Sequence, residues 1–235
     1  MAVQALLFDV FGTVVDWRSS IIREGEALGR RLGVEVDWTA FADAWRGLYQ
    51  PSMEAVRSGR REWMILDELH RESLLVLLER FGLGGRLDEA QIDEFNRAWH
   101  RLDPWPDTLA GLTRLRTRFT LATLSNGNVA LLVNMAKRIG LPWDAVLGAE
   151  TARAYKTLPE AYLRTAAMLG RAPGECMLVA AHNDDLRKAQ ALGFATAFVC
   201  RPTEYGPAQR EDLAPDGAWD HAVDSMTALA DALGC

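Results

Sequence analysis

The feature that most constrains this chain is an alternation of short, mainly apolar segments with helical segments, interrupted once by a long helical stretch. Apolar runs of strand length occur at residues 3–10, 119–124, 144–147, 177–181 and 196–200. Continuous apolar runs are typical of strands covered on both faces, as in a parallel sheet. Helical segments lie between the later runs, and strands that alternate with helices predict an α/β sheet with right-handed crossovers.

The long helical stretch covers residues 17–99, where apolar side chains recur with the period of a helix. Gly33 marks the end of one helix within it. Pro104 and Pro106 close the stretch, because neither can continue a helix interior. We therefore predict a Rossmann-like, parallel-sheet α/β core with an inserted helical cap domain. The core would comprise residues 1–15 and 100–235, and the cap residues 16–99.

Composition excludes several classes of protein. The 26 Lys and Arg residues against 32 Asp and Glu give a formal charge of −6, which argues against a nucleic-acid partner. The three cysteines are too few and too scattered for a disulfide framework, and the four histidines lack zinc-ligand spacing. No segment reads as a leader or a membrane span. We expect a cytoplasmic protein without a metal and without a membrane partner.

Polar side chains follow several of the predicted strands, at the sheet edge where ligands bind in open α/β folds. Each of them, taken alone, is also an ordinary helix-capping residue. Asp9 is different, since a carboxylate in an apolar strand needs a partner, and Gly12 beside it indicates a backbone turned close to a ligand. The candidates at this edge are Asp9, Thr13, Ser125, Asn126, His182, Asp184 and Asp185, with Lys156 just before a helix.

These residues resemble four motifs of the haloacid dehalogenase superfamily, in the same order and spacing across nearly the whole chain. Residues 8–16 resemble the first motif, and Leu124-Ser125-Asn126-Gly127 the second. Lys156 resembles the third, and the run ending in Asp185 the fourth. The helical insertion falls where that superfamily places its cap.

Position 11 separates the branches of this superfamily. Its phosphatases carry a second Asp two residues after the nucleophile, and this chain carries Phe11 there. An aromatic ring can neither protonate a leaving alkoxide nor coordinate Mg²⁺. An aromatic residue here is characteristic of the L-2-haloacid dehalogenase (type II) branch, so the resemblance implies hydrolysis of small 2-haloacids to 2-hydroxy acids, with water as co-substrate and no cofactor.

The resemblance also implies a mechanism. Asp9 would displace halide from carbon and form an ester, which water would then hydrolyse. Lys156 would keep Asp9 ionised, and a buried site would strip its water. Arg46 and Asn126 would receive the halide. Ser125 and Thr13 would hold the substrate carboxylate or Asp9, and Asp185 would position Lys156 or activate water.

Further site residues follow from the same resemblance. Trp45-Arg46 is similar to a Trp-Arg pair of this branch, and Tyr162 matches another of its positions. Trp45 and Trp63 are expected to line a small apolar pocket. His182 replaces the family's Asn and either donates an N–H to the halide or the Asp9 ester, or packs at a helix entry. Asp184 replaces an aromatic residue beside the halide, so either it points away or the halide site is built differently.

Two other functions stay open. One is a small-metabolite phosphatase that recruits another acid, and the second is a non-catalytic binding module. The complete Asp–Ser–Lys–Asp set counts against the module, because paired charges in a buried site are costly without a function. From the family we also expect a homodimer formed through the cap.

Overall fold

The computed structural model describes residues 2–235 and centres on one five-stranded sheet. The strand order is β4-β1-β5-β6-β7, and every neighbouring pair is parallel. The predicted α/β fold is therefore confirmed. The strands are β1 (Ala5–Phe8), β4 (Thr120–Thr123), β5 (Cys176–Ala180), β6 (Ala195–Val199) and β7 (His221–Val223).

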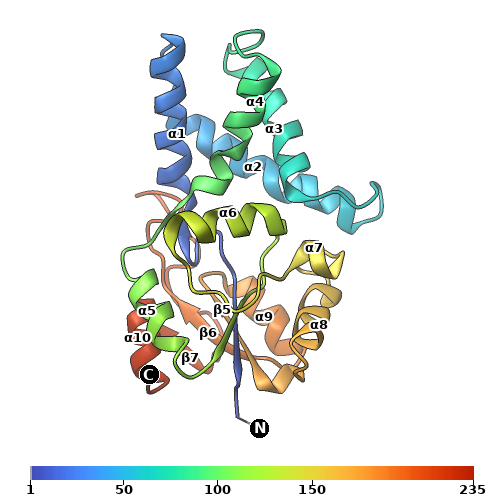
Figure 1. Cartoon of the computed structure of the whole chain (residues 1–235), viewed down its shortest axis with the longest axis vertical. Helices are drawn as coiled ribbons and strands as arrows, with labels where there is room; N and C mark the ends of the chain where they lie inside the picture. Colours follow the sequence, from blue (N-terminus) through green and yellow to red (C-terminus); the bar gives the residue numbers. More distant parts are fainter. Residues whose placement is uncertain (1) are drawn as a thin grey trace.

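Helices cover both faces of this sheet (Figure 1), with the termini at its lower end. On one side lie α5 (Thr108–Leu115) and α10 (Met226–Ala232), and on the other α8 (Pro159–Met168) and α9 (Asn183–Ala191). Strand β1 contributes side chains to the apolar clusters on both faces of the sheet, because successive side chains of a strand point to opposite faces. Leu6 and Phe8 belong to one apolar cluster, whereas Leu7 belongs to the other.

The inserted helices gather at the opposite end of the molecule, above α6 (Val129–Ile139) (Figure 1). They are α1 (Trp17–Leu32), α2 (Trp38–Arg57), α3 (Leu66–Arg80) and α4 (Glu89–Asn96), followed by a 3₁₀ turn at Arg97–Arg101. Helix α1 begins where the Asp16 side chain accepts from the Ser19 N–H, and it ends at Gly33 in the left-handed conformation (φ 64°).

A short antiparallel ribbon lies where the chain leaves the core and where it returns. It consists of β2 (Val15–Asp16) and β3 (Asp103–Pro104). This position supports the division into a core of residues 1–15 and 100–235 and a cap of residues 16–99, which stays a prediction. No helix within residues 2–235 is long and apolar enough to cross a membrane.

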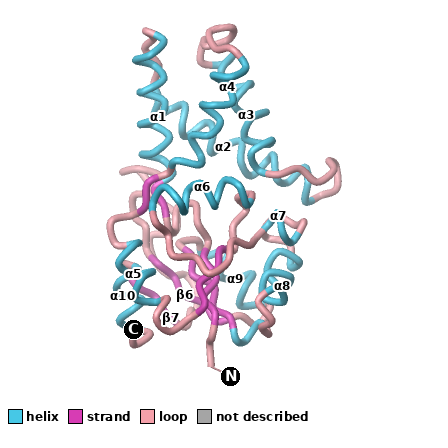
Figure 2. The backbone as a smooth tube through the Cα atoms, viewed as in Figure 1, coloured by secondary structure: helices cyan, strands magenta, loops and turns pink. Residues whose placement is uncertain are grey.

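The segment 144–147, expected to form a strand, does not form one. Ala145 and Gly148 make only isolated bridges, to Ala122 and Ser125 (Figure 2 shows loop here). The reason is local, since the Asp144 carboxylate accepts the Leu121 N–H at 2.9 Å and so occupies a donor that a continuous ladder would use. One further helical turn, α7 (Ala149–Ala152), follows.

Candidate active site

A cavity of about 440 Å³ lies where the carboxyl ends of the central strands face cap helix α2. Asp9 follows β1, Asn126 follows β4 and His182 follows β5, so parallel pairing brings all three to one place. The lining residues are Asp9, Phe11, Arg46, Tyr49, Gln50, Arg57, Asn126, Lys156, Thr157, His182, Asp184, Asp185, Tyr205, Glu211 and Asp212.

Asp9 is 6% exposed, and both of its carboxylate oxygens are engaged. Oδ1 accepts from the Lys156 ammonium at 2.8 Å, and Oδ2 accepts from the Thr13 hydroxyl at 2.7 Å. His182 Nδ1 lies 3.2 Å from Oδ2. The Thr13 hydroxyl accepts from the Ala181 N–H at 2.8 Å, which leaves its own proton directed at Asp9. Burial alone would raise the pKa of Asp9, but the positive charges of Lys156 and His182 outweigh burial and hold this pKa well below its usual range.

Lys156 lies between two carboxylates. Its ammonium donates to Asp9 at 2.8 Å and to Asp185 Oδ2 at 2.5 Å, while Asp185 Oδ1 accepts from the Tyr162 hydroxyl at 2.5 Å. Burial opposes the charge on Lys156, but Asp185 and Asp9 raise its pKa above the ordinary value. Both Asp185 oxygens are thus occupied, which favours a role in positioning Lys156 over one in activating water. Tyr162 is fully buried and acts through Asp185.

Arg46 enters the cavity from α2. Its guanidinium carbon lies 4.3 Å from the centroid of the Tyr49 ring and 5.2 Å from that of Trp17, and its Nη2 lies 3.8 Å from Glu204. Nη1 is buried and has no hydrogen-bond partner among residues 2–235. A buried N–H group without a partner is costly, so Arg46 offers a site for an anion.

The loop after β4 combines a cavity residue with a supporting one. Asn126 lines the cavity, and its side-chain oxygen accepts from the Lys156 N–H at 2.8 Å. The hydroxyl of Ser125 is fully buried and accepts from the Gly127 N–H at 3.1 Å. Ser125 therefore shapes the loop, and Asn126 presents its amide to the cavity. Phe11 lies beside them with its ring edge-on to Tyr49 (6.3 Å).

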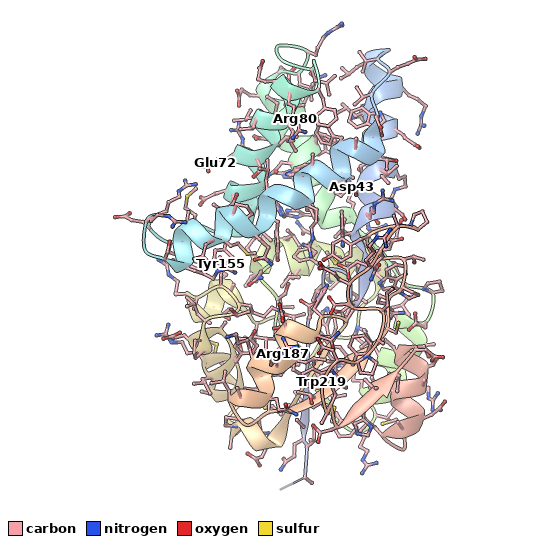
Figure 3. The ribbon with its side chains drawn as sticks, turned by 180° about the vertical axis from the view of Figure 1, so that it is seen from behind. Asp43, Glu72, Arg80, Tyr155, Arg187 and Trp219 are labelled. Atoms are coloured by element: carbon pink, nitrogen blue, oxygen red, sulfur yellow. The ribbon has the colours of Figure 1, made fainter. Side chains whose placement is uncertain are left out.

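Trp45 and Trp63 were expected to line the cavity, and the described structure places both elsewhere. Trp45 is buried in the cap, where its indole N–H donates to the His70 carbonyl at 3.2 Å. Neighbouring helix residues point about 100° apart, so with Arg46 facing the cavity Trp45 faces the cap interior. Trp63 stacks on Tyr155 at 4.8 Å. Figure 3 shows Tyr155 at the border of cap and core. Tyr49 supplies the aromatic wall instead.

The two departures from the family pattern at positions 182 and 184 have separate outcomes. His182 contacts Asp9 on one side and Glu204 on the other, where Nε2 lies 2.9 Å from Oε2. Burial opposes charge on His182, but Glu204 and Asp9 raise its pKa well above the usual value. Asp184 is 90% exposed and pairs with Arg187 at the rim, so it points away from Asp9.

Two residues at the site, one of them behind the cavity wall, have no signal in the sequence. Glu204 is fully buried although it lies in a loop after β6, and it accepts from the Trp17 indole N–H at 3.0 Å. Arg57 on α2 donates to the Lys156 carbonyl at 2.6 Å and lines the cavity. Gly12 was the one sequence feature that pointed to a close neighbour at this place. A Cβ there would lie 2.2 Å from the Glu204 carboxyl carbon, so the close approach that Gly12 indicated is to Glu204.

Comparison with known proteins agrees with this geometry. The family described as haloacid dehalogenase-like hydrolase matches residues 3–193. The crystal structure of a defluorinating L-2-haloacid dehalogenase is 51% identical, with a TM-score of 0.96 over 99% of this chain and 96% of that chain. The crystal structure of a second L-2-haloacid dehalogenase is 48% identical, with a TM-score of 0.96 over 99% of both chains.

A curated relative, the (S)-2-haloacid dehalogenase of Xanthobacter autotrophicus, is 28% identical over 203 residues, which is 85% of this chain and 76% of that protein. The chain therefore belongs to the haloacid dehalogenase-like hydrolases, in the L-2-haloacid dehalogenase branch.

Proposed function

We propose that this protein hydrolyses the carbon–halogen bond of small 2-haloalkanoic acids to give 2-hydroxy acids, through an ester on Asp9 and without a metal. The observation that carries this proposal is the buried, ionised Asp9 carboxylate held by Lys156, with Phe11 where a phosphatase would need an acid. The names of the 48% and 51% identical structures, both L-2-haloacid dehalogenases, support it.

In the first half-reaction, an Asp9 oxygen attacks the halogen-bearing carbon from the side opposite the halogen. The new C–O bond forms as the C–halogen bond breaks, and the halogen leaves with the electron pair as halide. Asp9 lies almost out of contact with water, so its charge is poorly hydrated and available to attack. Arg46, with its unpartnered Nη1, provides positive charge for the departing anion.

In the second half-reaction, water attacks the Asp9 carboxyl carbon and the ester bond between that carbon and the alkoxide oxygen breaks. One water proton goes to the alkoxide, which becomes the product hydroxyl. The second is released as Asp9 ionises again. The protein needs no leaving-group acid in the first step, since halide is a weak base.

A single turnover in heavy-oxygen water tests this scheme directly. With enzyme in excess over chloroacetate, we expect the label in Asp9 and unlabelled glycolate, because water attacks the carboxyl carbon. Asp9→Asn should abolish halide release and keep the folded circular dichroism spectrum. Label found only in the first-turnover product would contradict the ester, and Mg²⁺-dependent phosphate release from simple esters would favour a phosphatase.

Two further expectations stay predictions. All three cysteines are free, which is consistent with a reducing compartment and hence a cytoplasmic location. The homodimer is testable by light scattering coupled to size exclusion, in which a monomer mass would contradict it.

A further inference from the structure

A second ion pair lies directly against Asp9, and the attack on carbon does not use it. His182 Nδ1 lies 3.2 Å from Asp9 Oδ2, and its Nε2 lies 2.9 Å from Glu204 Oε2. An imidazole with a carboxylate at each nitrogen donates at both only when it carries both protons. The carboxylates of Glu204 and Asp9 raise the pKa of His182 well above its usual value and so favour the imidazolium, which cannot act as a base. The other charged groups around the same cavity are Arg46, Arg57, Lys156, Asp184, Asp185, Glu211 and Asp212.

The surroundings of Glu204 are built to hold this pair. Glu204 is fully buried, the Trp17 indole N–H donates to it at 3.0 Å, and Gly12 leaves the space that its carboxylate fills. Gly12 has φ +86°, a conformation that disfavours any side chain as well. Burying such a pair carries a desolvation penalty that stability alone repays poorly. The pair therefore calls for a role in the reaction.

The donors on Asp9 are distributed unequally between its two oxygens. Oδ2 accepts from the Thr13 hydroxyl and lies 3.2 Å from His182 Nδ1 in an ion pair, so two polar groups face this oxygen. Oδ1 receives only Lys156 among the described residues and keeps one lone pair free. Oδ1 is accordingly the oxygen able to attack carbon, and Oδ2 becomes the carbonyl oxygen of the ester.

We propose that His182 is a catalytic residue of ester hydrolysis, donating with Thr13 to Asp9 Oδ2 as negative charge develops on that oxygen. This inference rests on the proposed dehalogenase function. Water bonds to the Asp9 carboxyl carbon while the carbonyl electron pair moves onto Oδ2. That pair then restores the carbonyl as the bond to Oδ1 breaks and Oδ1 leaves with the product. His182 keeps both protons throughout and stabilises the oxyanion by its N–H and its charge.

Glu204 is the matching positioning residue. Once Asp9 is esterified it no longer carries a charge, and Glu204 is then the carboxylate that still contacts His182. Glu204 thus keeps the imidazole ionised during the step in which the oxyanion forms. Its replacement by Gln keeps a side chain of the same shape and an acceptor for the Trp17 N–H, but removes the charge.

A rapid-quench experiment with excess chloroacetate separates the two half-reactions, using chloride release and the mass of the intact protein as readouts. For His182→Ala we expect a burst of about one chloride per active site and accumulation of the carboxymethyl ester on Asp9. The following steady rate should fall roughly 100-fold, the usual effect of losing one oxyanion donor. His182→Asn, which restores a neutral donor, should recover part of that rate. His221→Ala, a histidine on β7, is the matched control.

Each outcome of this experiment has a defined meaning. The inference is overturned if His182→Ala accumulates no ester. This holds both for a variant that loses the chloride burst and for one with a normal steady rate. A wild-type protein that releases no halide overturns the proposed function instead. Glu204→Gln provides an independent test. Without that carboxylate, burial lowers the pKa of His182 in the ester, so the variant's ester-hydrolysis rate should increase as pH falls, whereas the wild-type rate stays flat. Identical pH profiles for the two proteins would also overturn the inference.

Discussion

At the scale of single residues, the site is a chain of alternating charges in which each member depends on the next. Lys156 is the cation shared by Asp9 and Asp185, and it is only 6% exposed, so little solvent can replace a lost partner. The first motif and Lys156 could be predicted from the sequence because each follows a recognisable local pattern. Glu204 could not, since its function depends on contacts with His182 and Trp17 from distant parts of the chain.

Lys156→Met should destabilise the protein by about 3–5 kcal/mol at pH 8, because it leaves the buried Asp185 without its cation and leaves Asp9 with His182 alone. In the wild type the depressed pKa of Asp9 contributes stability throughout the neutral range, and this is lost only in strong acid. In the variant, His182 alone opposes the effect of burial, so the pKa of Asp9 rises and the protein regains stability as pH falls. Urea unfolding at pH 5 and pH 8 measures the difference. Lys188→Met, at an exposed position on α9, is the control, and an equal loss at both pH values would contradict the prediction.

At the scale of elements, the ends of the strands could be predicted from the sequence. The surroundings of each buried helix residue could not. The apolar runs locate β1, β4, β5 and β6 to within a few residues, and parallel pairing then brings their carboxyl ends together. Helix α2 buries a single stripe that includes Trp45 and Tyr49, one turn apart, and this pattern alone does not tell which of the two lines the cavity. Strand β7 is short and only partly buried, so it has no clear apolar run.

Trp45 and Tyr49 lie one turn apart on α2 but have different surroundings, the cap interior and the cavity, and this predicts different effects when each is replaced. Trp45→Ala should cost about 3–5 kcal/mol of stability, as for a large aromatic residue in a packed core, yet leave kcat/KM of the folded protein within about threefold. Tyr49→Leu removes the ring beneath the Arg46 guanidinium, an interaction of about 0.5–2 kcal/mol, and should lower kcat/KM roughly tenfold with little loss of stability. Urea unfolding and halide release on the same preparations give both quantities. The reverse assignment would show that Trp45 is the residue that meets the substrate.

At the scale of the whole molecule, the active site exists only while the cap is seated on the core. Several hydrogen bonds cross this boundary, including three between residues 57–67 and the core. Arg57 donates to the Lys156 carbonyl at 2.6 Å, Tyr155 donates to the Met64 carbonyl at 2.8 Å, and Asn128 donates to Asp67 at 2.8 Å. These contacts were not predictable because they join segments that have no sequence relation to one another. They fix the width of the cavity and hence how much water surrounds Asp9.

Arg57→Ala should therefore weaken catalysis without touching the reacting atoms. Its contact holds the backbone of Lys156, so its loss should both loosen the cap and let water hydrate Asp9, which lowers the reactivity of the carboxylate. We expect kcat to fall about tenfold, from the loss of one buried, charge-assisted hydrogen bond of about 1.5–3 kcal/mol. Arg60→Ala, three residues further along at an exposed position, is the matched control and should behave as wild type. Equal activity of the two variants would mean that the cap is held in place by its apolar contacts alone.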